Sequence, residues 1–480
     1  MKFLQAIPFI LFLFWVIPAG LAANEKRPDV VFIIVDDLND WLGCLGGHPN
    51  AKSPHMDSLA AGGMLFTQAY CNSPQCRPSR TSLNHGVYPF RTGIYFNARF
   101  RGETRVTTPT MQQFFMGHGY RVVSGGKVFH GTPGKHGDVL FQKPKDPKPP
   151  KGKDKFNPVG VPSDGFALDV ADREMSDYKV ASWAINQWKT ASEKPLFMSV
   201  GFYRPHRPLQ VPKTWFEKFP LDSIRRPEEP EGVDDWEDLP MFARQLARSH
   251  AHKPMHRMPG GKRLSDHEHI VTHQEWDATI RAYQASVAFV DQQIGRFVQA
   301  LEENPRGRET YIMLVSDHGW HLGEHRIFGK HTSFEKALKS VLIMRTPGMK
   351  KPGRPTDALV QSIDIYPTLA KLSGLTPPKD INGKNFLDLL NNPSLPGPEY
   401  AFSYNQSYGP PFRGKPRMYA VTLRSRVYRY IQWQKDLAEG EILFRELYDH
   451  RSDPGETNNL AASEPKVIKH FEKILNEHLD

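Results

Sequence analysis

The feature that most constrains the fold is the segment 29–35, in which one Asp is followed by six apolar, mostly β-branched residues. A strand of this kind is buried on both faces, as in the parallel sheet of an α/β protein. Three more strand-like runs occupy 122–128, 195–201 and 310–316. Charged or histidine residues lie at the end of each run, and ligands bind at the carboxyl ends of parallel strands. The chain is therefore predicted to be an α/β protein with its site at one sheet edge.

The length of 480 residues allows one large domain and an appendage. Apolar residues at helical spacing predict helices at 54–62 and 279–301. A stretch rich in Pro, Asn and Gly at 391–398 marks a boundary, and the four short strand-like runs and the terminal helix beyond it predict a small α+β subdomain. The expected organisation is a main domain and a C-terminal subdomain, 23–392 and 393–480.

The N-terminus has the pattern of a signal peptide. Lys2 precedes an apolar core from Ile7 to Ile17, and small residues surround a cleavage point near Ala22. We expect residues 1–22 to be removed on export, with an uncleaved anchor as the alternative. The apolar core is short for a transmembrane span, so stable membrane insertion is not expected.

The net charge of +10 suits a polyanionic substrate, and no feature of the sequence indicates nucleic-acid binding. Three cysteines are too few for a disulfide framework. Pairing of Cys44 with Cys71 is left open, because sequence does not show how close their Cα atoms lie. The third cysteine, Cys76, begins the motif Cys-x-Pro-Ser-Arg, which ends at Arg80. Taken alone, Cys76 could be a buried, inert thiol.

Two strand ends carry carboxylates: Asp36 and Asp37 follow the first run, and Asp317 follows the last, next to His318. Adjacent carboxylates are costly in a core unless a cation neutralises them, and hard oxygen ligands suit Ca²⁺. The alternative for Asp-Asp after a strand is a turn or a helix N-cap. Imidazole is an unusual ligand for a hard cation, so the role of His318 is open.

The remaining candidates are bases and cations at strand ends beside Gly or Pro. Lys127 and His130 lie three residues apart, His206 lies between two prolines, and Lys330 follows a glycine. Lysine supplies a compact charge for an anionic oxygen, and histidine accepts a proton near neutral pH.

In this order the segments resemble the type I, formylglycine-dependent sulfatases of the alkaline phosphatase-like superfamily, over about residues 28–460. The likeness is greatest to the iduronate-2-sulfatase branch, which also has His where this chain has His318. The motifs that carry the resemblance are Asp36-Asp37, Cys76-x-Pro-Ser-Arg80, Gly126-Lys127-x-x-His130, Pro205-His206, Asp317-His318-Gly319 and Lys330.

The resemblance implies a large mixed sheet sandwiched by helices, and a maturation enzyme that oxidises Cys76 to formylglycine. It implies one Ca²⁺ held by five residues: Asp36, Asp37, Cys76, Asp317 and His318. One hydroxyl of the hydrated aldehyde would attack sulfur, and His130 would deprotonate the second hydroxyl. His206 or Lys330 would assist the leaving oxygen, and Arg80, Lys127 and Lys330 would neutralise sulfuryl charge.

The expected substrate is a sulfated saccharide, with 2-O-sulfated uronic acid favoured because Arg204 and Arg207 flank His206 and could meet a carboxylate. Two alternatives are a phosphonate or phosphodiester hydrolase with the same nucleophile, and a sulfated-glycan binder whose Cys76 is never matured. The Lys/Pro-rich segment 143–157 and the His-rich segment 244–273 depart from the family pattern. The second is expected to be a solvated loop rather than a metal cluster. Because both could shape the pocket, the sugar and the sulfated position stay open.

Overall fold

The computed structural model describes most of the chain. The signal peptide expected at residues 1–22, all of segment 149–166 and most of segment 245–262 lie outside the described residues. The described segments are 27–97, 106–131, 136–148, 167–228, 236–240, 243–244, 256–257, 263–407, 418–437 and 440–479.

A seven-stranded sheet forms the centre of the molecule, in the order β2-β15-β11-β1-β7-β4-β5. The central strand β1 runs parallel to both neighbours, β7 and β11, while β15 is antiparallel to β11. The mixed sheet expected from the sequence is therefore present. Its strands are β1 (Val30–Val35), β2 (Met64–Leu65), β4 (Arg121–Gly126), β5 (Val139–Phe141), β7 (Leu196–Phe202), β11 (Tyr311–Ser316) and β15 (Leu342–Arg345).

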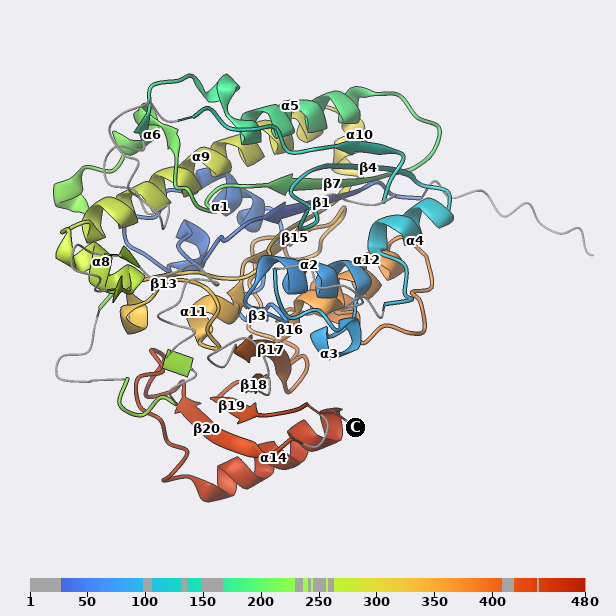
Figure 1. Cartoon of the computed structure of the whole chain (residues 1–480). Coiled ribbons are helices and arrows are strands. Elements are labelled where there is room, and N and C mark those ends of the chain that lie inside the picture. Colours follow the sequence, from blue (N-terminus) through green and yellow to red (C-terminus); the bar gives the residue numbers. More distant parts are fainter. Residues whose placement is uncertain are drawn as a thin grey trace, which may run out of the picture.

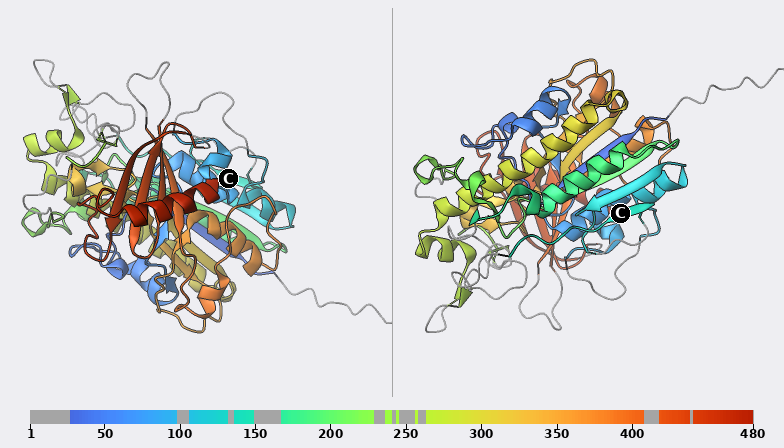
Figure 2. Two further views of the ribbon diagram at one scale, coloured as in Figure 1. Left: turned by 90° about the horizontal axis from the view of Figure 1, so that it is seen from below. Right: turned by 90° about the horizontal axis from the view of Figure 1, so that it is seen from above.

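Helices cover both faces of this sheet, as Figures 1 and 2 show. The odd-numbered side chains of β1 enter a core shared with α5 (Ser176–Lys189) and α9 (Trp276–Glu302). The even-numbered side chains enter a second core, shared with α4 (Met111–Gly117) and α12 (Ile365–Leu372). Because successive side chains of a strand point to opposite faces, a strand between two cores must be apolar throughout.

The C-terminal part is a four-stranded antiparallel sheet with one helix against it, seen at the bottom of Figure 1. Apolar side chains of these strands and of the helix form a third core together with Tyr88, Tyr95, Phe96 and Ile363 of the main domain. We propose that the boundary between the main domain and the C-terminal subdomain lies between residues 392 and 393. The elements are β17 (Ala401–Ser407), β18 (Met418–Arg424), β19 (Tyr428–Gln434), β20 (Ile442–Asp449) and α14 (Pro465–Leu479).

A buried ion-pair network fastens the C-terminal sheet to the main domain. The guanidinium of Arg429, on β19, contacts Glu335 of α11 (Glu335–Leu338) and donates to Oε1 of Glu456 at 2.5 Å. Arg424 pairs with Glu335 at 3.3 Å, and His450 lies 2.8 Å from Glu456. Both carboxylates are thus held by positive or proton-donating partners from the C-terminal sheet.

Shorter elements complete the fold. Among the described residues, no helix has both the length and the apolar composition that a membrane span requires. The remaining elements are η1 (Gly43–Leu45), α1 (Pro54–Ala61), β3 (Ala69–Tyr70), α2 (Cys76–His85), α3 (Pro89–Thr92), β6 (Ala167–Leu168), η3 (Asp172–Glu174), β8 (Val211–Pro212), α6 (Lys213–Phe216), η4 (Leu221–Ser223), β9 (His256–Arg257), β10 (Arg263–Leu264), α8 (Asp266–Thr272), α10 (Pro305–Arg308), β12 (His321–Leu322), η5 (Glu324–Arg326), β13 (Phe328–Gly329), β14 (Lys339–Ser340), β16 (Val360–Gln361), η6 (Ser362–Asp364) and α13 (Leu387–Asn391).

Candidate active site

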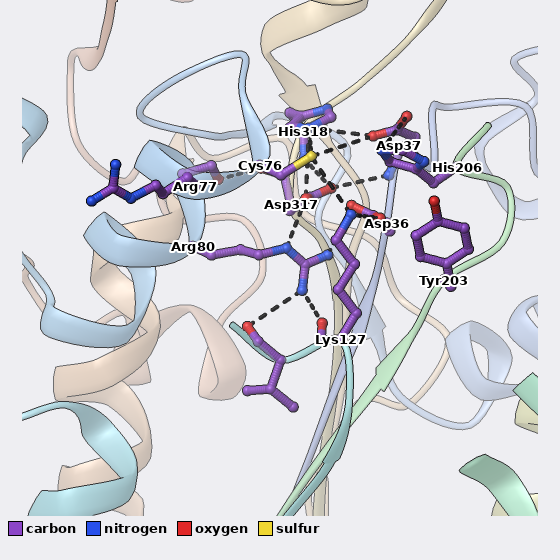
Figure 3. A network of polar contacts seen from close by, with 12 residues as sticks. Asp36, Asp37, Cys76, Arg77, Arg80, Lys127, Tyr203, His206, Asp317 and His318 are labelled. Atoms are coloured by element: carbon purple, nitrogen blue, oxygen red, sulfur yellow. Dashed lines mark hydrogen bonds and ion pairs between the residues drawn. The ribbon is translucent and has the colours of Figure 1, made fainter. Parts of the chain in front are cut away.

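Five buried side chains from three segments meet at the carboxyl end of β1. They bring potential ligand atoms within 4.8 Å of one another, and Figure 3 shows them converging. They come from the end of β1, the start of α2 and the end of β11, and they are the set that the resemblance implied: Asp36, Asp37, Cys76, Asp317 and His318.

Backbone hydrogen bonds fix the two strand ends against each other. The amide of Asp317 donates to the carbonyl of Val35 at 3.2 Å, and the amide of Asp37 donates to Oδ1 of Asp317 at 3.0 Å. Asp37 has a φ of 59°, a left-handed conformation that Asp tolerates better than most residues. This turn directs both Asp36 and Asp37 toward the thiol of Cys76 instead of to opposite faces.

Arg80 lies one helical turn beyond Cys76 on α2 and is buried. Its Nε donates to Oδ2 of Asp317 at 2.9 Å, and its Nη2 donates to Oδ1 of Asp36 at 3.0 Å. Its Nη1 contacts the carbonyl of Lys127 and lies 3.3 Å from that of Val128. Every branch of this guanidinium is thus occupied, and it joins α2 to the ends of β1, β11 and β4.

Two ammonium groups complete the centre. Nζ of Lys127 contacts Asp36 and lies 3.9 Å from Sγ of Cys76; Nζ of Lys330 contacts Asp37 and lies 2.9 Å from the same sulfur. The turn before Lys127 depends on two glycines. Gly126 has a φ of 75°, and a Cβ there would lie 2.0 Å from the carbonyl oxygen of Gly201. A side chain at Gly126 would therefore push Lys127 away from the site.

Two histidines, His318 and His206, each direct one ring nitrogen toward the centre of the site. Nδ1 of His318 lies 2.9 Å from the carbonyl of Gly319, and Nδ1 of His206 lies 2.6 Å from that of Arg207. A carbonyl only accepts, so both Nδ1 atoms carry the proton and both Nε2 atoms are bare. Nε2 of His318 faces Sγ of Cys76 at 3.5 Å, and Nε2 of His206 faces Asp37 at 3.9 Å.

Burial and charge shift the pKa values of these groups in different directions. Burial would raise the pKa of Asp36, but Lys127 and the other cations hold it well below its usual value. Burial raises the pKa of Asp37, and the nearby charge of Asp36 adds to this rise. Burial and then the Lys127 ammonium lower the pKa of His130 to about 4, so this imidazole is neutral at physiological pH.

The structure places the two outer arginines differently from the expectation that they meet a substrate carboxylate. Arg204 is buried: its Nε donates to the carbonyl of Gln210 at 2.8 Å and its Nη2 to Asp146 at 2.9 Å. Arg207 pairs with Asp266 at 3.4 Å and lies over the ring of Trp320. Both guanidinium groups are engaged by other parts of the protein, so we propose that they hold the loop around His206.

Sequence reasoning missed the residues that hold this loop. Asp177, on α5, accepts the amides of Tyr203 and Arg204, each at 2.8 Å. Asp146 engages Arg204 from 58 positions away. Neither acidic residue lies in a motif, so the sequence carries no signal for them. Tyr203 does follow β7 directly, and its place at a strand end was a signal that could have been used.

The three cysteines are not disulfide bonded in the structure. Cys44 is half-buried near Asp57, whose Oδ1 accepts its amide at 2.8 Å, whereas Cys71 is fully buried and its thiol contacts the carbonyl of Ala337.

Two family models match this chain and together extend over residues 28–480. The family model described as Sulfatase matches residues 28–375, and the one described as N-sulphoglucosamine sulphohydrolase, C-terminal, matches 323–480. A sulfatase from Formosa agariphila is 33% identical, covering 91% of this chain and 83% of that protein. Human iduronate 2-sulfatase is 30% identical and covers 90% of each chain. A Δ4,5-hexuronate-2-O-sulfatase from Bacteroides thetaiotaomicron is 26% identical, covering 96% of this chain and 89% of that protein.

Solved structures show the same fold. A phosphonate monoester hydrolase of Agrobacterium radiobacter superposes with a TM-score of 0.77 at 23% identity, covering 95% of this chain and 96% of that one. A 2-O GAG sulfatase superposes with a TM-score of 0.71 at 23% identity, covering 95% and 92%. The expected alkaline phosphatase-like fold is confirmed.

Proposed function

Because this chain belongs to the sulfatase family of sulfuric ester hydrolases, we propose that it removes the 2-O-sulfate of a hexuronic acid in a sulfated saccharide. The support is the names of two relatives that align over almost the whole chain, an iduronate 2-sulfatase and a hexuronate-2-O-sulfatase. The non-catalytic glycan binder is disfavoured by membership of a hydrolase family.

The nucleophile that we propose is formylglycine at position 76. The supporting observation is that the thiol of Cys76 is fully buried, and burial followed by the charge of Asp36 raises its pKa above the ordinary cysteine value. A thiol of this kind is not a thiolate nucleophile at neutral pH. As its hydrate, formylglycine would supply one hydroxyl that accepts the sulfuryl group and a second whose deprotonation releases sulfate.

We propose that Ca²⁺ binds between Asp36, Asp37, Asp317, His318 and the side chain at position 76. The donor set fits: Oδ2 of Asp37 is buried without a hydrogen-bond partner, although the rest of the cluster is densely paired. The bare Nε2 of His318 faces the same space, so this imidazole is available as a ligand. The ion would supply positive charge that polarises a sulfuryl oxygen.

The other residues have roles that follow from their charge and position. Arg80 positions Asp36 and Asp317, while Lys127 and Lys330 face position 76 and would neutralise sulfuryl oxygens. His206 is neutral without substrate, because burial lowers its pKa well below its usual value. A bound sulfate ester favours protonation of its Nε2, and this proton would pass to the leaving sugar oxygen.

His130 completes the cycle as the base that takes the proton from the second hydroxyl. Its Nδ1 is buried without a hydrogen-bond partner, and the ring is neutral at physiological pH. A neutral imidazole with an available lone pair is what this step requires.

We further propose export, with removal of residues 1–22, and a maturation enzyme that oxidises Cys76. The support is the sequence pattern alone: a positive residue, an apolar core and small residues for export, and Cys76-x-Pro-Ser-Arg80 for maturation.

The function is tested by comparing three substrate classes on the purified mature enzyme: a 2-O-sulfated hexuronate disaccharide, a sulfated neutral disaccharide and a phosphonate monoester. The highest kcat/KM is expected for the hexuronate. A phosphonate preference would instead support the alternative hydrolase, and a preference for the neutral sugar would reject the uronate. Mass spectrometry of the peptide containing residue 76 tests the nucleophile separately, since formylglycine is lighter than cysteine by the loss of H₂S and the gain of one oxygen.

A further inference from the structure

A third lysine, besides Lys127 and Lys330, approaches the active site from the Lys/Pro-rich segment. Nζ of Lys143 lies 3.9 Å from the ring centroid of Tyr203, and Nζ of Lys127 lies 5.0 Å from the centroid of the same ring. That ring lies 4.7 Å from the ring of His206 and is tilted against it. Figure 3 shows Tyr203 beside His206 and the Lys127–Asp36 pair. One aromatic ring therefore connects the catalytic centre to an ammonium group outside it.

The charge of Lys143 is weakly compensated. Its ion pair is with Asp146, at 3.7 Å, and it reaches the carbonyl of Pro144 only at 3.4 Å. The carboxylate of Asp146 makes shorter contacts with other groups. It accepts hydrogen bonds from Nη2 of Arg204 at 2.9 Å and from the amide of Ser176 at 2.8 Å. Burial lowers the pKa of Lys143 from its ordinary value, and Asp146, its ion-pair partner in the described part of the chain, only partly offsets this.

Exposure separates this lysine from those at the centre. The side chain of Lys330 is 4% exposed and that of Lys127 is 12% exposed, whereas those of His206 and Lys143 are each 25% exposed. His206 and Lys143 therefore lie at the solvent side of the site, where the sugar must remain while its sulfate enters. The hydroxyl of Tyr203 donates to the carbonyl of Arg207 at 3.0 Å, so the ring between these two residues is held in place.

We propose that Lys143 is a substrate-binding residue that pairs with the second anionic group of the substrate, the carboxylate of the uronic acid, beside the ring of Tyr203. This inference rests on the proposed function. It replaces Arg204 and Arg207 in that role, because both guanidinium groups are engaged by the protein. The Lys143 ammonium has an ion pair with Asp146 at 3.7 Å. Such an ammonium gains more from a charge-assisted hydrogen bond to a substrate carboxylate than a cation that must first break a close ion pair.

Two features of the site suit a sugar that carries a carboxylate in addition to its sulfate. Lys127, Lys330 and Arg80 are committed to the metal ligands and to position 76, so an additional anion needs an additional cation. The ring of Tyr203, over which the ammonium of Lys143 lies, keeps this additional cation beside His206. Together, Lys143 and Tyr203 would distinguish a sugar with a carboxylate from a neutral sugar at the rim of the site. Neither side chain needs to contact the sulfate for this.

The experiment compares wild type, Lys143→Met, Lys143→Arg and Lys145→Met on two substrates. The first is a 2-O-sulfated hexuronate disaccharide, and the second is an aryl sulfate without a carboxylate, which reports the sulfuryl chemistry alone. Lys145 is an exposed neighbour in the same segment, so Lys145→Met controls for loss of one positive charge. Thermal unfolding of each variant checks that the fold is retained.

For Lys143→Met we expect KM for the hexuronate to rise about tenfold, equivalent to about 1.4 kcal/mol, with kcat within about twofold of wild type. The aryl sulfate parameters should not change, Lys143→Arg should restore most of the affinity, and Lys145→Met should match wild type. Equal losses on both substrates, or no loss on either, would overturn the assignment to Lys143. Failure of the proposed function is read from wild type alone, as absence of a preference for the hexuronate, and would overturn both.

Discussion

Nζ of Lys330 lies 2.9 Å from Sγ of Cys76, although 254 residues separate them in the chain. The same ammonium contacts Asp37. Burial lowers the pKa of Lys330, but Asp37 and the other negative groups around it together raise this pKa above its ordinary value. Position 76 therefore faces a permanent positive charge. A neutral group there is stable in the resting protein, and a group that gains negative charge during reaction is stabilised.

Replacement of Lys330 by Met should lower kcat about 10²–10³-fold, because a preorganised charge at the reacting atoms is lost. KM should change much less if the lysine acts mainly in the transition state. Steady-state kinetics with an aryl sulfate measures both. Lys371→Met, an exposed substitution on α12, is the matched control and should behave as wild type. A kcat within about threefold of wild type for Lys330→Met would contradict this role.

Cys76→Ala should abolish turnover, with kcat reduced about 10⁴-fold or more, because no nucleophile remains at the start of α2. Cys76→Ser should be nearly as inactive, since a serine sulfate ester lacks the second hydroxyl that expels sulfate. Both proteins should unfold near the wild-type temperature, because the residue contributes little volume to the core. Wild-type turnover in either variant would contradict the formylglycine mechanism.

Chelation of calcium should destabilise the protein as well as inactivate it. A ligand present at 1,000 times its Kd stabilises the native state by about 4 kcal/mol, and its removal leaves Asp36, Asp37 and Asp317 with fewer cations. Thermal unfolding with and without chelator, followed by addition of Ca²⁺, measures the effect. In Asp37→Asn the melting temperature should respond much less to chelator. Identical melting curves for wild type in chelator and in excess Ca²⁺ would argue against the metal site.

The network around Arg429 should make the protein sensitive to acid. Burial alone would raise the pKa of Glu456, but Arg429 and His450 lower it to about 2. A carboxyl whose pKa is lowered on folding stabilises the native state above its unfolded pKa near 4.5. This stability, on the order of 3 kcal/mol, is lost as the pH falls from about 4.5 toward 2.

Arg429→Met should reverse the direction in which the free energy of unfolding changes with pH. Without the guanidinium, Glu335 and Glu456 become buried carboxylates with too few partners, and the free energy of unfolding at pH 7 should fall by about 3–5 kcal/mol. Their protonation then favours the native state, so the variant should gain stability between pH 7 and pH 5 while wild type changes little. Urea unfolding at these two pH values measures it, and a parallel decline of both proteins would contradict the account.

Much of the fold could be predicted because β1 and α9 carry strong local patterns. The apolar run at 29–35 became β1, and the helix expected at 279–301 extends from Trp276 to Glu302. The strand expected at 122–128 ends earlier, at Gly126, because the left-handed turn there is required by the approach of Gly201. The short antiparallel strand β15 was missed, since four residues are too few for a reliable period.

The site could be predicted in its residue types but not in its pairings. Asp36, Asp37, Cys76, Asp317 and His318 were expected together, and they do lie together. The partners of Arg204 could not be foreseen, since an ion pair with Asp146 depends on where a loop folds back and leaves no periodic trace in the sequence. For the same reason the cation nearest Tyr203 at the rim, Lys143, was not singled out from its lysine-rich surroundings.

Under the proposed conversion of Cys76 to formylglycine, the complete burial of this residue sets an order of events in biosynthesis. An oxidising enzyme must hold the peptide around its target, but here residues 78–80 are buried in the first turns of α2, and Arg80 is paired with Asp36 and Asp317 at two strand ends. Oxidation of this side chain therefore has to precede closure of the sheet, while the segment is still an extended chain. A molecule that folds before oxidation remains a stable, well-packed protein with an unmodified cysteine at position 76. The proportion of active enzyme in a cell then depends on the relative rates of folding and oxidation, and slower folding should increase this proportion.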